Sequence, residues 1–211
     1  MRKAPPRYTD ITTWRKSGEK FALWIFVTEV EAIFHIAKGN NCEVALDLLG
    51  KHSGTDVHDR FRAIDTLASD IHNTQQYCWS HIMCDAKELE EFYGDEGRII
   101  RESLQKVHKE VKSFRGHGTM EDVDHLYENL VFLLDRDYAH RRSRKLVDNL
   151  LRRRRDWLSR FFIDPEVELT NNRAERALRP SVIYRKASGG SRRIGGQRHT
   201  QYSHPYSTHR S

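Results

Sequence analysis

Two apolar runs near the N-terminus constrain the fold of this chain most strongly. Residues 21–28 read FALWIFVT and residues 32–37 read AIFHIA, with the short acidic stretch EVE between them. Runs of this length, rich in aromatic and β-branched residues, are typical of buried strands. Residues 7–15 follow two prolines and alternate as a strand does. One face of that strand would carry Tyr8, Asp10, Thr12 and Trp14. With KSGEK as a turn, the N-terminus predicts a three-stranded meander.

Two shorter segments add strand candidates further along the chain. TDVHD (55–59) and QQYCW (75–79) have strand length, and NNCEVALDLLGKH between the meander and the fourth strand predicts a short helix ended by Gly50. Because strands and helices alternate here, the pattern predicts an α/β fold with a mixed five-stranded sheet and flanking helices.

From about residue 80 to about residue 162 the pattern is helical. Apolar residues recur at helical spacing, and glycines stop the first two helices. Residues 119–162 predict one long helix or two shorter ones, broken at Pro165. A last helix begins near Asn172 and is expected to be disrupted around Pro180. The sequence therefore predicts an all-helical insertion before the final helix.

Composition excludes several classes of protein. The 211 residues are 37% hydrophobic and 31% charged, which is typical of a soluble globular protein. No apolar run approaches the roughly 18–20 residues of a membrane span. The start, MRKAPPRYTD, has no apolar core of a signal peptide. Three scattered cysteines favour a reducing cytoplasm over a disulfide framework.

Positive charge is concentrated in two segments. The net charge is +6, but residues 141–160 carry nine Lys/Arg against two Asp. Residues 173–211 carry nine Lys/Arg against Glu175 alone. The remainder of the chain is therefore acidic. This asymmetry indicates a polyanionic partner, and the alternative is a solvated basic helix followed by a basic tail.

The lone acid of the second basic segment suggests a metal ligand. Carboxylates from distant parts of a chain can converge on two divalent ions about 3.5–4 Å apart, and Mg²⁺ prefers such oxygen ligands. Asp10 in the first strand and Asp59 at the end of the fourth are the other candidates. Position alone does not select these three from 30 acids. Glu175 also stands three residues after Asn172, where it could be the partner in a helix cap.

Four segments carry a resemblance to a known family. YTDITTWRKSGEKFALWIF, TDVHDRFRAIDTLA, QQYCWSHIMCDAKEL and LTNNRAERALRPSVIYRKASGG occur in the order found in the insertion sequence 66 group of DDE transposases. The chain resembles that group over about residues 7–193, most specifically in TNNRAERALRP…RKASGG. The resemblance implies an RNase H-like fold and a catalytic Asp, Asp and Glu, which are Asp10, Asp59 and Glu175 here.

The resemblance also implies a layout and an activity. Residues 1–79 would form the RNase H-like core, 80–164 the helical insertion, 165–193 the catalytic helix with its DNA-contact segment, and 194–211 a disordered tail. Two Mg²⁺ or Mn²⁺ ions would serve cleavage and strand transfer of DNA at the element ends and target. We expect a cytoplasmic, nucleoid-associated protein that does not bind membranes and can form a homo-oligomer. The expected phosphate contacts are Arg176, Arg179, Arg185, Lys186 and Arg192.

Departures from the family leave other functions open. Ile11 stands where family members usually have an acid, the long N-terminal DNA-binding region is absent, and the tail after SGGSR turns polar. These features are typical of a truncated copy, so the alternative function is a catalytically inactive remnant that only binds DNA. A host RNase H-like nuclease or resolvase fits the Glu175 block less well. Cys78, His81 and Cys84 lack a fourth zinc ligand at suitable spacing, so we expect them to serve packing.

Overall fold

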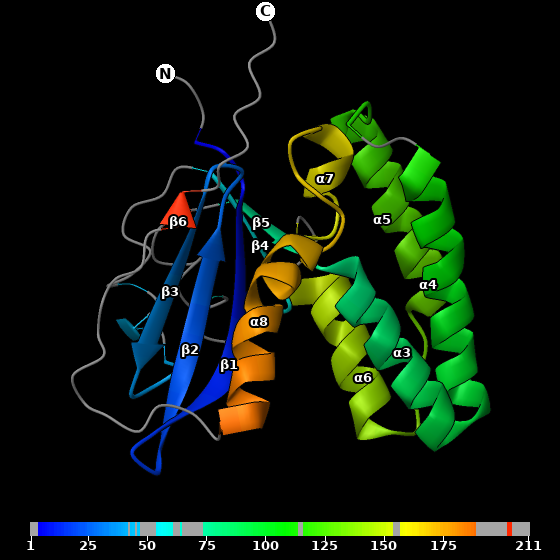
Figure 1. The fold of residues 1–211 in the computed structure, drawn as a ribbon. Helices are drawn as coiled ribbons and strands as arrows, with labels where there is room; N and C mark the ends of the chain where they lie inside the picture. The colour runs from blue at the N-terminus through cyan, green and yellow to red at the C-terminus, as the bar shows by residue number, and fades with distance from the viewer. Residues whose placement is uncertain are drawn as a thin grey trace, which may run out of the picture. The chain divides into compact units, whose positions relative to one another are not determined.

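The structure is a computed structural model that describes residues 4–41, 43–44, 46, 54–60, 64, 74–113, 116–153, 157–188 and 202–203. The chain divides into two compact units. The first contains residues 1–74 and 171–211, and the second contains residues 75–170. The first unit is built on a β-sheet and the second consists largely of helices (Figure 1).

The sheet has the strand order of an RNase H-like fold. Its strands are β1 (Arg7–Lys16), β2 (Glu19–Val27), β3 (Glu31–Ala37), β4 (Thr55–His58), β5 (Thr74–Tyr77) and β6 (Tyr202–Ser203), in the order β5-β4-β1-β2-β3-β6. Strand β2 pairs antiparallel with both β1 and β3, whereas β4 pairs parallel with β1. All five predicted strands are present, which confirms the expected mixed α/β sheet. The short β6, which pairs with β3, falls in the segment for which the sequence predicts a disordered tail.

The turn between β1 and β2 follows from its residues. Ser17 and Gly18 both have positive φ, 52° and 84°, while Lys16 and Glu19 on either side are paired. A two-residue hairpin turn with positive φ at both positions matches the right-handed twist of the strands. The KSGEK segment therefore sets the register of the whole β1–β2 hairpin, including the position of Asp10 opposite Ile25.

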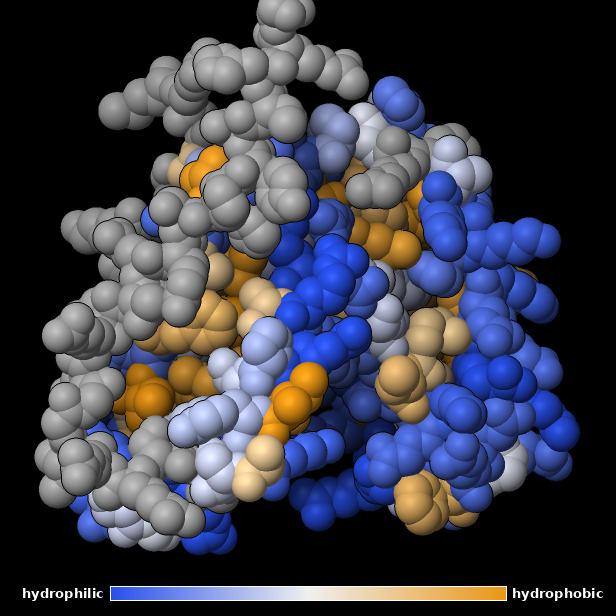
Figure 2. Space-filling model, in the orientation of Figure 1, coloured by the Kyte–Doolittle hydropathy of each residue, from blue (hydrophilic) through white to orange (hydrophobic). Residues whose placement is uncertain are grey.

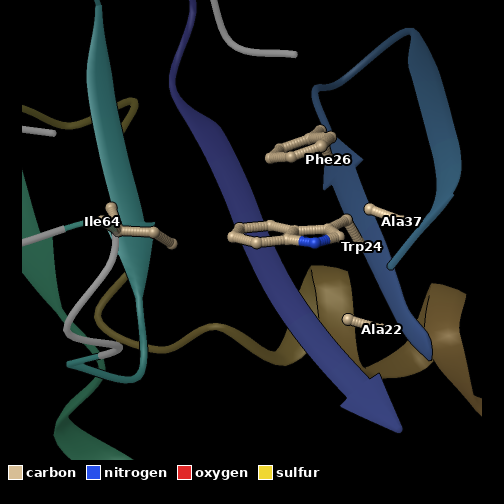
Figure 3. Packing of buried hydrophobic residues seen from close by; sticks show 5 residues of the cluster. All are labelled: Ala22, Trp24, Phe26, Ala37 and Ile64. Atoms are coloured by element: carbon tan, nitrogen blue, oxygen red, sulfur yellow. The ribbon is translucent and has the colours of Figure 1, made fainter. Parts of the chain in front are cut away.

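One face of the sheet buries a cluster centred on Trp24. Ala22, Trp24 and Phe26 alternate along β2 and pack with Ala37 and Ile64 (Figure 3). Trp24 is fully buried, and its Nε1 donates a hydrogen bond to the carbonyl of Gly39 at 3.3 Å. Ile64 lies at a helical position outside the strands. The short helix predicted between β3 and β4 is described at residues 43, 44 and 46, and all three are helical.

The opposite face of the sheet is covered by α8 (Asn172–Ser188). Alternation along β1 puts Tyr8, Asp10, Thr12 and Trp14 on this face, and their partners in β2 include Leu23, Ile25 and Val27. These three β2 side chains are buried, as are Ala174 and Leu178 of the helix. Strand β2 therefore contributes apolar side chains to both faces of the sheet.

Helix α8 continues through Pro180, so the expected disruption there is wrong. A proline in a helix removes one backbone hydrogen bond and usually bends the chain. Residues beyond Pro180 are held to β1 instead. The ring of Tyr184 stacks on Trp14 with centroids 6.2 Å apart, and Arg185 Nη1 donates to Thr12 Oγ1 at 2.8 Å. These contacts with the sheet stabilise the second half of the helix.

The second unit contains five helices and a π-helical turn among its described residues. They are α3 (Trp79–Tyr93), α4 (Asp95–Ser113), α5 (Met120–Leu134), α6 (Arg141–Asp148), η1 (Asn149–Arg153) and α7 (Arg160–Ile163). Apolar stripes of α3, α4 and α5 are buried, for example Ile82, Leu104 and Leu130. In the part of the chain that the structure describes, no helix combines the length and apolarity needed to span a membrane.

For residues 119–162 the prediction of one long helix is wrong, because the segment breaks after Leu134, and the form with two shorter helices misses the short α7 that follows α6 and η1. The reason for the break after Leu134 is a set of hydrogen bonds, two of them to Glu96 outside the segment. The carboxylate of Glu96 accepts from Ala139 N at 2.6 Å and from His140 N at 3.2 Å. The hydroxyl of the buried Tyr138 donates to Leu134 O at 2.9 Å. These bonds satisfy backbone groups that a continuous helix would otherwise use.

Candidate active site

Asp10 lies in the middle of β1, on the face that α8 covers. It is half-buried and stands opposite Ile25, which is fully buried. Its neighbours on the same face are Tyr8 and Thr12, both of which contact α8 residues. Asp10 Oδ1 also accepts a hydrogen bond from Ile11 N at 2.7 Å. The carboxylate is therefore held close to the strand, at the face turned towards the helix.

Asp59 follows the last residue of β4, and the strand register predicts its position relative to Asp10. In the parallel ladder Arg7 pairs with Asp56 and Tyr8 pairs with Val57. Continuing this register by two residues brings Asp59 beside Asp10. Neighbouring strands lie about 4.8 Å apart, and paired residues point to the same face. The register therefore predicts that these two acids are neighbours although 49 positions separate them in the sequence.

A buried ion pair fixes this register. Arg7 Nε contacts Asp56 Oδ1 at 2.7 Å, and the two side chains are only 9% and 1% exposed. Because such a pair tolerates little displacement in the low-dielectric interior, it locks β4 against β1 three residues before the acids. Sequence reasoning missed this role, since nothing local marks Asp56 as the partner of Arg7.

The residue after Asp59 has an unusual backbone conformation. Arg60 has a φ of 67°, in the left-handed region that residues other than glycine seldom adopt. Strained backbone of this kind often occurs where a strand end presents a functional side chain. His58 is fully buried, and alternation puts it on the face opposite Asp59. His58 is therefore not a candidate catalytic residue.

Glu175 lies in the first turn of α8, which is tied to β1 beside Asp10. Asn171 is fully buried, and its Nδ2 donates to the carbonyl of Thr9 at 2.8 Å. Glu175 N in turn donates to Asn171 O at 3.1 Å. The guanidinium of Arg173 lies over the ring of Tyr8, 5.0 Å from its centroid. The start of α8 is thus attached to Thr9 and Tyr8, the two residues that precede Asp10.

The capping interpretation of Glu175 fits this geometry poorly. Helix α8 begins at Asn172, so the N-cap is Asn171 and the acid of a capping box would stand at position 174. That residue is Ala174, which is buried. By contrast, Thr119 and Asp122 form a complete capping box at the start of α5. Glu175, half-buried beside the sheet-facing stripe of α8, remains the candidate ligand.

The predicted DNA-contact residues fall into two groups in the described part of the chain. Arg176, Arg179 and Lys186 are exposed along α8. Arg185 is half-buried and bonds to Thr12 Oγ1 and to the carbonyl of Thr13, so it anchors the helix to β1. Arg192 lies outside the described residues. The surface over α8 is mainly hydrophilic, with hydrophobic side chains exposed towards the C-terminal half (Figure 2).

The cysteines considered as zinc ligands lie at the start of the helical unit. Cys78 is buried just before α3, and Cys84 is exposed on that helix. Trp79 beside Cys78 is also fully buried, and its Nε1 donates to Leu158 O at 2.9 Å. Cys78 therefore belongs to a well-packed strand-to-helix junction.

Comparison with known proteins identifies the family. The family model described as "Transposase IS66 family" matches residues 2–199. The chain belongs to this transposase family. The match includes every segment on which the resemblance was based, and it confirms that resemblance. All three candidate acids of this transposase chain lie within the matched range.

Comparisons with curated proteins and with solved structures do not extend the family assignment. No curated protein matches the chain. Among solved structures, the chain is similar to the HTLV-2 integrase catalytic core domain in complex with magnesium, in a dimeric form, at 11% identity and a TM-score of 0.29. That match covers 72% of this chain and 90% of the integrase chain. The trimeric form is similar at 11% identity and a TM-score of 0.29, covering 71% and 86%.

Proposed function

We propose that this IS66-family chain is the catalytic part of a DDE transposase that cleaves DNA and transfers strands. The observation that supports the proposal is the parallel pairing of β1 with β4, a register that, continued by two residues, would put Asp59 level with Asp10. The implied substrates are the DNA ends of the element and a target DNA. We expect the protein to act in the cytoplasm, associated with the nucleoid, and to function as a homo-oligomer.

The donor set fits two hard divalent cations. Asp10, Asp59 and Glu175 offer only carboxylate oxygens, which suit Mg²⁺ or Mn²⁺ and do not suit softer metals. When bound, such ions would polarise the scissile phosphate and favour deprotonation of the attacking water or 3′-hydroxyl. In this proposal Asp10 and Asp59 hold the ions, and Glu175 completes the coordination of one of them.

The other residues of the site position its parts. Asn171 and Arg185 tie the two ends of α8 to β1, so Glu175 stays beside the strand that carries Asp10. The exposed Arg176, Arg179 and Lys186 would bind phosphates of the DNA backbone, and Arg192 is proposed for the same role. Such contacts give affinity that falls with salt and depends little on base sequence.

Ile11 does not argue for an inactive remnant. Its side chain packs against the Trp24 cluster, which lies on the face of the sheet opposite Asp10. An acid at position 11 would therefore not share the face of the three candidate ligands. No described feature of the site favours the inactive remnant over the enzyme, and catalysis by the purified chain distinguishes the two.

A nicking assay tests the proposal directly. We expect the purified chain to nick supercoiled DNA in the presence of Mg²⁺ or Mn²⁺ and not in the presence of a chelator. Asp10→Asn, Asp59→Asn and Glu175→Gln should each reduce nicking to background, because an amide oxygen holds a cation far more weakly than a carboxylate. Glu29→Gln is the matched control, since Glu29 is exposed in the turn between β2 and β3. Full nicking by any of the three variants would contradict the site assignment.

A further inference from the structure

The helical unit has a basic hollow that the proposed active site does not use. It has a volume of about 770 Å³ and lies around α6 and the segments on either side of it. Its basic lining residues are Arg136, Arg141, Arg144, Lys145 and Arg152. We propose that this hollow is a second DNA-binding surface, which holds the sugar-phosphate backbone of duplex DNA. The inference rests on the proposed function, because it takes DNA as the substrate.

The hollow keeps an excess of positive charge, because its five basic side chains face three lining carboxylates, Asp135, Asp137 and Asp148. Arg152 contacts Asp148 at 3.1 Å and Asp135 at 3.4 Å, so a single arginine pairs with two of the lining acids. The other four basic side chains form no ion pair with any residue that the structure describes. A cluster in which cations outnumber carboxylates keeps a net repulsion, which a bound polyanion relieves.

Two of the guanidinium groups are already held in position. Arg144 Nη1 donates to Tyr138 O at 2.6 Å and to Ala139 O at 3.0 Å. Arg136 Nη2 donates to Leu133 O at 2.9 Å. Carbonyl oxygens orient a guanidinium without cancelling its charge, and each group keeps further N–H donors for a phosphate. Less side-chain entropy is then lost when an anion binds.

Helix stability does not account for these cations. Helix α6 has no acidic residue in its first turn, where Arg141, Arg142 and Arg144 stand instead. The helix dipole disfavours positive charge at this end, so the sequence is the reverse of what would stabilise an isolated helix. Arg141 and Lys145 are exposed and lie one turn apart on the same side of α6. Their spacing suits successive contacts with a phosphodiester backbone.

DNA-binding measurements with a double variant test the inference. Arg141→Gln with Lys145→Gln removes two exposed charges that form no ion pair within the described residues. Binding to a 30-base-pair duplex of arbitrary sequence is measured by fluorescence anisotropy, without divalent metal, over a range of salt concentrations. The slope of log K against log salt changes by about 0.9 for each phosphate contact, so it should flatten by about 1.8 in this variant.

The matched control is Lys106→Gln with Lys109→Gln on α4. Both lysines are exposed, form no ion pair within the described residues and lie outside the hollow. The control loses the same net charge, and its slope should stay within error of the parent's. Equal flattening in the two variants, or none in the α6 variant, would overturn the inference.

Chemical footprinting gives a second readout on the unaltered protein. Acetylation of Lys145 should be suppressed by duplex DNA, while acetylation of Lys106 and Lys109 should be unchanged. Free reaction of Lys145 in the complex would overturn the inference. The nicking assay is run as a separate measurement on the parent and on the α6 double variant. A parent that nicks DNA while Lys145 remains reactive refutes the second surface alone, whereas a parent that binds no DNA refutes the proposed function as well.

Discussion

Glu175 has two possible roles that differ in their energetics. As a helix cap it would interact with backbone N–H groups, and glutamine serves that role nearly as well. As a ligand it would need its negative charge. A metal ion that binds only the folded protein stabilises it by about 2.7 kcal/mol at a concentration 100 times its Kd. The dependence of the melting temperature on Mg²⁺ therefore separates the two roles.

We predict that Mg²⁺ raises the melting temperature of the parent chain and raises that of Glu175→Gln much less. In the absence of metal, Glu175→Gln should be as stable as the parent or slightly more so, because one of three clustered negative charges is removed. Thermal unfolding followed by circular dichroism measures both effects, with Glu29→Gln as the control. Equal metal-induced shifts in parent and variant would return Glu175 to a capping role.

At the scale of elements, the site depends on how β1 pairs with β4. The pairing is short, and its described partners are Arg7 with Asp56 and Tyr8 with Val57. The buried ion pair lies in this ladder. Removing one partner leaves an uncompensated charge in the interior, which costs about 3–5 kcal/mol.

We therefore predict that Asp56→Asn lowers the free energy of unfolding by about 3–5 kcal/mol, measured by urea denaturation. It should also weaken the Mg²⁺-induced shift, since Asp59 would no longer be held level with Asp10. The exposed pair of Lys38 with Glu19, whose atoms lie 3.6 Å apart, is the control. Lys38→Gln should cost less than about 1 kcal/mol. A similar small loss for Asp56→Asn would show that the ion pair does not hold the strands.

The α3–α4 hairpin depends on one close approach. Gly94 ends α3 with a φ of 57°, and Gly97 lies against the backbone of that helix. A Cβ at Gly97 would lie 2.2 Å from Glu90 N and from Leu89 C, both of them backbone atoms that a side-chain rotation cannot move. Gly97 therefore allows the two helices to pack, and the rest of the hairpin relies on buried apolar stripes.

We predict that Gly97→Ala lowers the free energy of unfolding by about 1–3 kcal/mol, the usual cost of overpacking, despite the better helix propensity of alanine. Gly39→Ala is a control without a clash, since the nearest atom to its Cβ would be 3.8 Å away, an ordinary van der Waals contact. Chemical denaturation of both variants decides the matter. A gain in stability for Gly97→Ala would mean that the helices separate without cost.

At the scale of the whole molecule, positive charge is presented by both compact units. Arg176 and Arg179 are exposed on α8 in the first unit, and Arg141 and Lys145 are exposed on α6 in the second. Among the residues that the structure describes, the two pairs have no contact in common, so the two sets of phosphate contacts should act independently.

We predict that Arg176→Gln with Arg179→Gln flattens the salt dependence of DNA binding by about 1.8, and that adding the α6 substitutions doubles the effect. The measurement is the slope of log K against log salt for the parent, each double variant and the quadruple variant. If the slope of the quadruple variant is no flatter than that of either double variant, the two surfaces do not bind the same DNA at once.

Local sequence patterns determined much of this fold. The apolar runs of β2 and β3, the alternation of β1, the Ser17–Gly18 turn and the helix stop at Gly94 each depend on residues that are close in the chain. Their propensities act over a few positions, so the sequence is sufficient to predict them. The candidate acids Asp10, Asp59 and Glu175 came from segments with a family resemblance, and spacing alone would not have selected them.

Only the tertiary structure decided how these pieces meet. The hydrogen bond that ties Asn171 to Thr9 spans 162 positions, and the ion pair that aligns β4 with β1 spans 49. The course of α8 through Pro180 depends on its contacts with Thr12 and Trp14, and the break after Leu134 depends on Glu96. Such contacts have no local signal, because their free energy appears only when distant segments are already packed together. The sequence therefore contains the acids, while the register of the sheet and the attachment of α8 make them a candidate site.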